Sequence, residues 1–190
     1  MRSLFAALLV PAAAFAQLSG SCVNPFQFDF QPDKVLRIRV RSGDIAVVGT
    51  DAPRVQVTCE SKGNPADIAV SIKPRARYSE LRIKNGPTNA RIRIEIPRKT
   101  HLWLRSPAGE ITVTDVTGNK DVAIHAGELR IAVADPYEYG HAEGSVKIGD
   151  LSANAFGVSK DGFFRSFKQR DLPGQYRLHA SVGVGELVLH

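Results

Sequence analysis

Apolar and polar residues alternate along most of this chain, with the two-residue period of a β-strand. In the segment 35–42, which reads "VLRIRVRS", aliphatic residues alternate with arginines, so one face is apolar and the other basic. The same alternation recurs in "RVQVTC", "DIAVSIK", "ELRIK" and "RIRIEIP", separated by turn clusters such as "KGNP" and "NGPTN". Because no long stretch has the spacing of an amphipathic helix, we expect an all-β fold with very little helix.

A short phrase of glycine, acid and alternating aliphatic residues also recurs. It reads "SGDIAVVG" from residue 42, "AGEITVTD" from 108, "AGELRIAV" from 126 and "GVGELVLH" at the end of the chain. We expect the chain to turn a corner at the glycine, which adopts a positive φ at little cost, and then to enter a strand. The corner glycines expected on this basis are Gly43, Gly109, Gly127, Gly144 and Gly185.

The glycines of the second half are almost evenly spaced, at 127 − 109 = 18 and 144 − 127 = 17 residues. A short, near-constant period of β character is typical of a β-solenoid, in which neighbouring coils stack to bury their apolar faces. We therefore expect solenoid-like stacking over residues 108–156. The alternative is an ordinary antiparallel sandwich whose hairpins are evenly spaced.

Charge divides the chain into two unlike halves. Residues 17–105 hold 16 Lys and Arg against 8 acids, whereas residues 106–190 hold 8 against 11. The predicted fold is therefore an extended N-terminal segment (17–33), a basic antiparallel β-sheet or sandwich region (34–105) and a short β-solenoid similar to a single-stranded β-helix (106–190). We expect 34–190 to form one continuous domain, with a C-terminal cap.

The first sixteen residues, "MRSLFAALLVPAAAFA", have the pattern of a cleaved signal peptide. Arg2 supplies a positive start, an apolar stretch follows, and "AFA" precedes Gln17 as a small-residue cleavage site. The apolar stretch is too short to span a bilayer, and no later segment is apolar for long enough to do so. We therefore expect a protein that is exported to the periplasm or cell surface.

Two cysteines remain in the predicted mature chain, Cys22 and Cys59. In an oxidising compartment such a pair suggests a disulfide. A second interpretation is a lipoprotein signal in "LSGSC", with Cys22 acylated, although Ser19 stands where a larger aliphatic residue is usual. Two free thiols are the third possibility.

The signal peptide, the "SGDI", "AGEI" and "AGEL" phrases and the ending "LHASVGVGELVLH" resemble a bacterial family of exported proteins. These are the putative-adhesin or auto-transporter-like domains of unknown function. The resemblance covers most of residues 34–190 and implies a short β-solenoid fold. The family has no agreed catalytic residues, so the resemblance assigns no site.

The sequence contains no recognisable motif of a catalytic or metal site. No two histidines have metal-ligand spacing, neither cysteine lies near a histidine, and nucleophile-elbow, Walker and dinucleotide-binding motifs are missing. Glu110 and Glu128 would lie in neighbouring coils and could bind a divalent cation, but an acid after a corner glycine is also what an exposed corner requires. We expect no enzyme, no metal and no cofactor.

Basic strand faces are the most suggestive feature of the chain. If the strands that carry them are neighbours, they form a cationic patch with Trp103 beside it. Arginine suits carboxylate and phosphate, so an anionic envelope polysaccharide such as lipopolysaccharide is a candidate partner, whereas export argues against nucleic acid. Arginine also simply keeps an exposed strand face polar. The candidate ligand residues are Arg37, Arg39, Arg41, Arg82, Lys84, Arg91, Arg93 and Trp103.

The segment 156–176, "FGVSKDGFFRSFKQRDLPGQY", breaks the repeat. Phe163, Phe164 and Phe167 are expected to fold back and cover the open end of the stacked coils, since terminal repeats need an atypical cover. With their basic neighbours they could instead form a binding loop.

The function favoured by these patterns is an exported, non-enzymatic envelope protein, either a structural module or an adhesion-like module that contacts another envelope component. A binding protein for anionic envelope glycans is the alternative, and a small glycan-active enzyme is a distant third.

Overall fold

A computed structural model describes residues 17–61, 63–87, 89–170 and 173–190. The predicted signal peptide, residues 1–16, lies outside the described residues. The predicted all-β fold is confirmed, since strands dominate and only short 3-10 turns interrupt them. Among the described residues no helix is long and apolar enough to cross a membrane.

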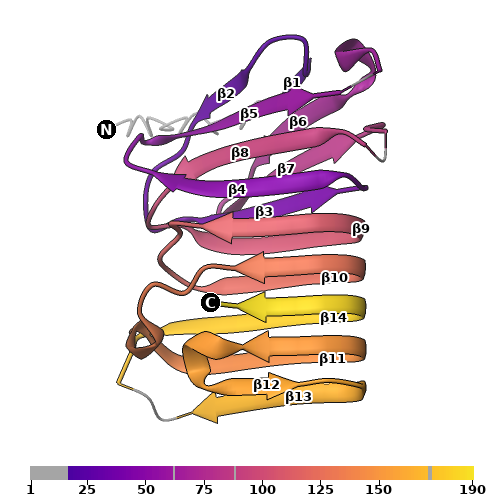
Figure 1. The fold of residues 1–190 in the computed structure, drawn as a ribbon. Helices are drawn as coiled ribbons and strands as arrows, with labels where there is room; N and C mark the ends of the chain where they lie inside the picture. Colours follow the sequence, from indigo (N-terminus) through magenta and orange to yellow (C-terminus); the bar gives the residue numbers. More distant parts are fainter. Residues whose placement is uncertain (1–16, 62, 88, 171–172) are drawn as a thin grey trace, which may run out of the picture.

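The strands are short at the N-terminal end and long in the second half (Figure 1). They are β1 (Leu18–Ser21), β2 (Phe26–Asp29), β3 (Val35–Val40), β4 (Asp44–Thr50), β5 (Arg54–Glu60), β6 (Ala69–Pro74), β7 (Tyr78–Lys84), β8 (Arg91–Pro97), β9 (His101–Thr114), β10 (Lys120–Ile131), β11 (Tyr139–Ala153), β12 (Val158–Lys160), β13 (Phe163–Arg170) and β14 (Tyr176–Leu189). The 3-10 turns are η1 (Pro65–Asp67), η2 (Pro136–Glu138) and η3 (Asn154–Phe156).

The strands form two facing layers joined along one edge (Figure 1). Each of the long strands β9, β10, β14 and β11 bends at a glycine, so its first half lies in one layer and its second half in the other. We call each such bent level a rung. Layer 1 also contains β1, β6, β7, β3 and β13, and layer 2 also contains β2, β5, β8, β4 and β12.

The rungs stack in an order that differs from the order of the sequence. From one end they are β1 with β2, β6 with β5, β7 with β8, β3 with β4, then β9, β10, β14, β11 and finally β13 with β12. The last strand of the chain, β14, therefore lies between β10 and β11. β9 crosses position 105/106, where the change of charge suggested a boundary, and the stacking is continuous on both sides of it.

The direction of pairing differs from the expected antiparallel N-terminal sheet. β3, β4, β7 and β8 pair in parallel with each other and with β9, as the solenoid rungs do. Among the described strands, antiparallel pairing is confined to the ends of the stack, where β5, β6, β1 and β2 close one end and β12 and β13 close the other. The solenoid-like stack therefore begins well before residue 108.

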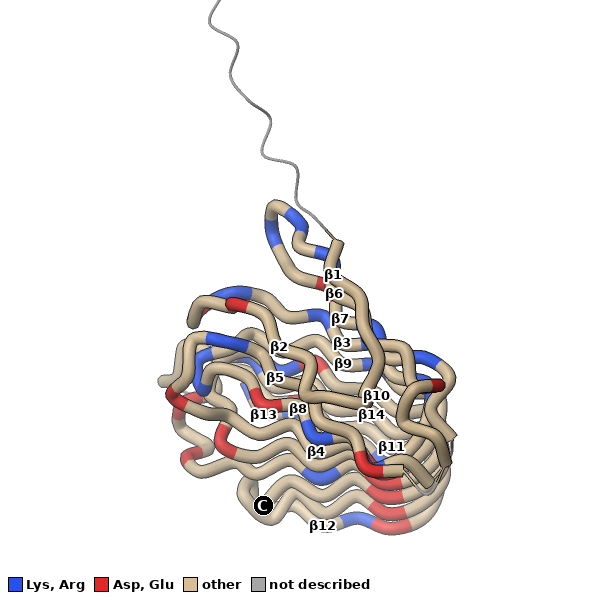
Figure 2. Tube along the Cα trace, turned by 90° about the horizontal axis from the view of Figure 1, so that it is seen from above, with Lys and Arg blue, Asp and Glu red and all other residues tan. Residues whose placement is uncertain are grey.

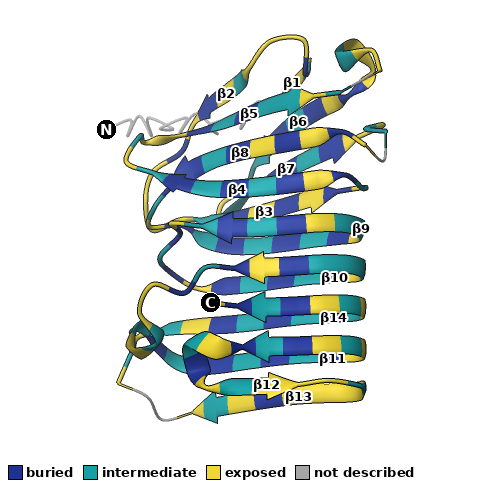
Figure 3. Cartoon of the chain, in the orientation of Figure 1, coloured by how far each residue is buried: buried dark blue, intermediate teal, exposed yellow. Residues whose placement is uncertain are grey.

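Alternation along each strand places aliphatic side chains between the two layers and polar ones outside (Figure 3). Parallel register then aligns the buried side chains into columns that run through the stack. One such column consists of Ile45, Ile111, Leu129, Leu187 and Leu151, all of them almost fully buried. Each rung therefore buries its apolar side chains against those of the next, as the glycine phrases predict.

The corner glycines occupy a position that no other residue fits. Gly127 has φ +125° and pairs with Gly109 on one side and Gly185 on the other. A Cβ on Gly127 would overlap the carbonyl oxygen of Gly109, and a Cβ on Gly185 would overlap that of Gly127. Gly43 has the same conformation at the corner between β3 and β4.

The expected corner at Gly144 is wrong. The corner of β11 is Gly149, which has φ +124° and pairs with Gly185. Gly144 lies inside the strand, opposite Ala180 and Phe167, and a Cβ there would overlap the Phe167 ring. Gly144 therefore serves packing, because it makes room for an aromatic side chain of the neighbouring strand.

The segment 156–176 does close the end of the stack, but only one of the three expected aromatics, Phe167, takes part. β12 and β13 pair antiparallel with the two halves of β11. Phe167 and Phe156 are buried, with ring centroids 5.5 Å apart. Phe163 and Phe164 do not fold back, since both side chains are exposed. The capping role therefore belongs to Phe156 and Phe167.

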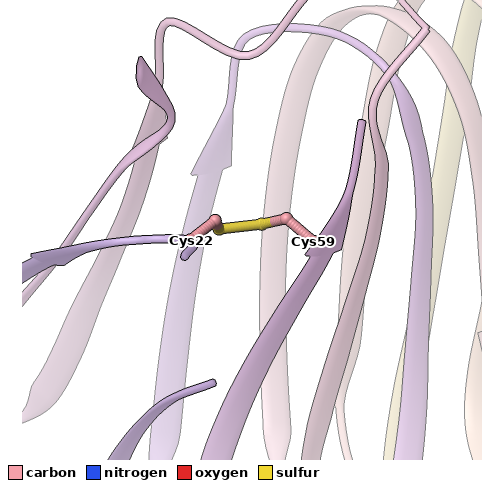
Figure 4. Close-up of a disulfide and its surroundings, with 2 residues drawn as sticks. All are labelled: Cys22 and Cys59. Carbon is pink, nitrogen blue, oxygen red and sulfur yellow. A yellow bond between two sulfur atoms is a disulfide. The ribbon is translucent and has the colours of Figure 1, made fainter. Parts of the chain in front are cut away.

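A disulfide joins Cys22 to Cys59 (Figure 4). Cys22 follows β1, Cys59 lies in β5, and the two Cα atoms are 5.5 Å apart. The bond thus fastens the outermost rung, formed by β1 and β2, to the rung beneath it.

Candidate functional site

The predicted basic residues divide between the two layers. Layer 1 carries on its outer face Arg37 and Arg39 from β3, Arg82 and Lys84 from β7 and Trp103 from β9, with Arg41 just after β3. Arg91 and Arg93 belong to β8 in layer 2. The two layers face opposite ways, so the expected single patch is in fact two separate groups.

Three arginines of layer 1 lie side by side across neighbouring strands. Arg39 is in register with Arg82 of β7 on one side and with Arg105 of β9 on the other. Adjacent strands are about 4.8 Å apart, and like charges directly opposite one another destabilise a sheet. The row of three guanidinium groups therefore lowers the stability of the fold. A role in binding an anion would explain why the row is present.

Two carboxylates offset part of this charge. Glu80 of β7 accepts a hydrogen bond from Arg82 at 2.8 Å and forms an ion pair with Arg39 at 3.3 Å. Asp121 of β10 accepts a hydrogen bond from Arg105 at 2.7 Å. Arg41 and Lys84 form no ion pair within the part of the chain that the structure describes.

Trp103 supports the arginines and is covered by them. The guanidinium carbons of Arg105 and Arg39 lie 4.3 Å and 5.0 Å from its ring centroid, while that of Arg37 lies 5.8 Å away. Arg37 sits closer to the Tyr78 ring, at 4.0 Å. Cation–π attraction holds these side chains in place. Trp103 therefore positions the cations, and its faces are not free to stack a ligand.

A groove of about 740 Å³ lies along the row of arginines where the rungs turn. It is bounded by the ends of β3 and β7 and by the bend of β9. Five cations and no acid contribute to its wall. The lining residues are Arg39, Val40, Arg41, Arg82, Ile83, Lys84, Asn85, Arg105, Ser106 and Pro107.

One donor in this groove has no partner. The Nε of Arg82 is buried and makes no hydrogen bond, although the Nη2 of the same side chain is bound to Glu80. Because this Nε atom is buried, it lies beneath the surface of the groove and does not itself contact a ligand there.

The basic residues of layer 2 have a different setting. Arg93 donates to Glu95 at 2.8 Å, and Arg91 lies 4.0 Å from Asp44. The groove beside them, about 290 Å³, is lined by acids as well as bases. These arginines are therefore neutralised by their neighbours, and the layer 2 groove has no excess of positive charge.

The acids that follow the corner glycines form a column. Asp44, Glu110, Glu128, Glu186 and Asp150 are in register from rung to rung, and Figure 2 shows acidic positions overlying one another at the turning edge. Glu110 and Glu128 are thus neighbours, as expected. Within residues 17–190, leaving aside those not described, no three His, Cys, Asp or Glu side chains gather as metal ligands.

A chain of polar contacts continues from the groove along the outer face of layer 1. Asp121 contacts His179 at 2.9 Å, and this hydrogen bond raises the pKa of the His179 imidazole. Burial acts to raise the pKa of Asp121, but the hydrogen bonds with His179 and Arg105 outweigh it and hold that pKa below its ordinary value. Glu143 pairs with Lys168 at 3.2 Å, which lowers the pKa of Glu143.

One charged group lies inside the core. Lys120 lies between Leu102 and Leu178 in a buried column, and donates a hydrogen bond to the Tyr139 hydroxyl. Burial lowers the pKa of Lys120 to about 8, although Glu138 opposes this. Burial also raises the pKa of Tyr139. Since Lys120 is only 1% exposed, no external ligand reaches it.

The strand pattern predicts which residues of a strand share an outer face, but not which strands are neighbours. Alternation in "HLWLRS" places Arg105 on the same face as Trp103, yet Arg105 and Glu80 were not among the predicted site residues. Their part in the groove depends on which strands are neighbours, and the alternation does not specify that.

No protein-family model matches the chain, and no curated protein matches it. Among solved structures, a putative cell adhesion protein from Clostridium sporogenes superimposes with a TM-score of 0.53. The two share 12% identity over 87% of this chain and 98% of that chain. At this identity the likeness establishes a common fold and nothing further.

Two further structures match more weakly. A putative adhesin from Parabacteroides merdae gives a TM-score of 0.33 at 11% identity, over 59% of this chain and 47% of that one. A putative adhesin from Bacteroides fragilis gives 0.31 at 8% identity, over 88% and 98%. The resemblance to exported adhesin-like domains seen in the sequence thus agrees with the first structure at the level of the fold.

Proposed function

We propose that the protein is an exported, non-enzymatic, adhesion-like module of the cell envelope that binds an anionic polymer in the basic groove of layer 1. The observation that supports this most is the row formed by Arg39, Arg82 and Arg105. Beside it lie Arg41 and Lys84, which form no ion pair with any residue that the structure describes. Export is supported by the predicted signal peptide and is consistent with the Cys22–Cys59 disulfide.

The groove suits an extended ligand better than a small one. It is open along its length and runs across β7, β3 and β9, so successive anionic groups of a polymer can contact successive strands. Guanidinium groups bind carboxylate and phosphate through paired N–H donors, and this binding breaks no covalent bond of the ligand. A carboxylated or phosphorylated envelope glycan, such as lipopolysaccharide, has anionic groups of this kind.

The same arrangement is poorly suited to catalysis. The described carboxylates nearest the groove, Glu80 and Asp121, are both occupied in ion pairs with its arginines. A hydrolase needs a free acid and base facing a bound substrate. We therefore favour recognition over turnover.

Binding of lipopolysaccharide and of polygalacturonate at about 0.15 M salt tests the proposal, with calorimetry as the readout. Arg41→Gln/Lys84→Gln removes two groove cations without breaking an ion pair. We expect affinity to fall about tenfold, because each exposed charge contact is worth up to about 1 kcal/mol and 1.4 kcal/mol is a factor of ten.

Arg91→Gln/Arg93→Gln is the matched control, since it removes the same charge from layer 2. We expect it to leave affinity nearly unchanged. Equal losses in both variants would mean nonspecific attraction to a basic protein. Absence of binding to either polymer would reject the proposed function and leave a structural module without this ligand.

A further inference from the structure

Exposed apolar side chains gather at the capped end of the stack, on the edge where the rungs turn. Phe163 and Phe164 of β13 are 68% and 81% exposed, while Ile148 of β11 and Val184 of β14 are 46% and 47% exposed. Ile148 is in register with Phe163 on one side and Val184 on the other. Phe163, Ile148 and Val184 therefore form one apolar surface across three neighbouring strands, and the exposed Phe164 follows Phe163 directly; these four residues are here called the aromatic tip.

Capping does not account for the aromatic tip. The end of the core is covered by Phe167 and Phe156, and neither Phe163 nor Phe164 is buried. Phe164 moreover has φ +53°, a left-handed conformation that is unfavourable for an aromatic residue. The chain therefore accepts backbone strain to hold a phenyl ring in solvent, and such uncompensated strain is typical of functional positions.

Cations flank the aromatic tip. Lys147, Lys160 and Arg165 are exposed and form no ion pair in the portion of the chain described. β13 itself, "FFRSFKQR", holds three cations and no acid. Asp150, Asp161 and Glu186 each lie two residues from a member of the tip in the sequence, so the excess of positive charge beside the tip belongs to β13.

We propose that the aromatic tip inserts into the interfacial region of an anionic phospholipid bilayer, with the flanking cations contacting the lipid headgroups. Phenyl rings and basic side chains on one surface are the combination that binds anionic membrane interfaces. The tip lies on β14, β11 and β13 towards one end of the stack, whereas the basic groove lies on β7, β3 and β9, with β10 between the two groups of strands (Figure 1). The two sites therefore act independently, and a membrane contact leaves the groove open.

Vesicle co-sedimentation tests this proposal on the whole protein. With vesicles of phosphatidylcholine containing about a third phosphatidylglycerol, we expect binding that weakens when phosphatidylglycerol is left out. Phe163→Ser/Phe164→Ser should lower the affinity for anionic vesicles at least about tenfold, because it removes most of the inserted apolar surface. Lys147→Gln/Arg165→Gln should lower it too, and should abolish the preference for anionic lipid.

Tyr137→Ser is the matched control, since Tyr137 is 66% exposed and lies in η2, away from the tip. It should bind vesicles as the wild type does. Equal binding by the wild type and the Phe163→Ser/Phe164→Ser variant would overturn the proposal, as would no binding to anionic vesicles. Self-association in the absence of lipid that this variant abolishes would also overturn it, in favour of a second copy as the partner.

The two sites are separated by crossing the assays. Phe163→Ser/Phe164→Ser should retain binding to polygalacturonate, and Arg41→Gln/Lys84→Gln should retain binding to vesicles. Loss of vesicle binding in the groove variant alone would place the lipid contact in the groove and contradict the role of the aromatic tip.

Discussion

Single glycines determine whether the rungs of this molecule stack. At a corner such as Gly127, positive φ and close backbone approach coincide, because the next glycine's carbonyl oxygen occupies the place of a side chain. Gly157 has positive φ as well, at +69°, but a Cβ there would meet nothing within 4 Å. Comparing Gly127 with Gly157 therefore separates the free-energy cost of a positive φ from the free-energy cost of the steric overlap.

We expect Gly127→Ala to lower the free energy of unfolding by at least about 3 kcal/mol, since it adds a steric overlap to a strained backbone. Gly157→Ala should cost only about 1 kcal/mol, the penalty of a left-handed conformation by itself. Urea unfolding of both variants measures the difference. Similar losses would show that contact between corner glycines does not limit the approach of the rungs.

The identity of the corner glycines was predictable at most positions and failed at one for a definite reason. In "GSVKIGDLSA", both Gly144 and Gly149 are followed by apolar residues at the second and fourth positions. Gly144 fits the preceding spacing, whereas Gly149 carries the acid that follows the other corner glycines. The spacing and the acid thus favour different glycines, and the pairing of Gly149 with Gly185, which is not a local contact, decides between them.

Among the elements, the cap shows how a strand with no repeat can still complete the stack. β13 pairs along the first half of β11 and inserts Phe167 into the space left by Gly144. Its other two aromatics remain outside. Burial and exposure thus divide one strand into a part that stabilises the fold and a part that is free to contact a partner.

Phe167→Ala should lower the free energy of unfolding by about 3 kcal/mol, because it removes a buried ring beside a glycine that cannot fill the cavity. Phe164→Ser should leave stability nearly unchanged or raise it slightly, since the ring is 81% exposed. Thermal denaturation of the two variants gives the comparison. A large loss for Phe164→Ser would mean that this ring belongs to the cap after all.

Strand existence was predictable from alternation, but strand direction and neighbours were not. The apolar face of "VLRIRVRS" is the same whether β3 pairs in parallel or antiparallel, so the sequence could not reveal that β3 lies between β7 and β9. The prediction of a single basic patch failed for the same reason. Arg39 and Arg82 meet because of that pairing, and Arg91 leaves the group because β8 lies in layer 2.

At the scale of the whole molecule, the stack of rungs is continuous only because β14 is part of it. β14 lies between β10 and β11, although residues 132–175 separate it from β10 in the chain. In the described part of the chain β11 has no other parallel neighbour, so without β14 the rungs from β11 onwards would be separated from the rest of the core. Among the described residues, the terminal rung of β1 and β2 has neighbours on one side alone.

Two deletions of equal length therefore should have unequal effects. Removing residues 177–190 takes a rung from the middle of the stack, exposes buried faces of both β10 and β11 and should abolish cooperative unfolding. Removing residues 17–30, with Cys59→Ser to avoid a free thiol, takes a rung from the end. It should lower the melting temperature but leave one cooperative transition, because the remaining rungs still stack in register. Circular dichroism melts and limited proteolysis distinguish the two results. Equal loss of stability in both deletions would show that end rungs and middle rungs contribute alike. That outcome would contradict a stack stabilised by contacts between neighbouring rungs.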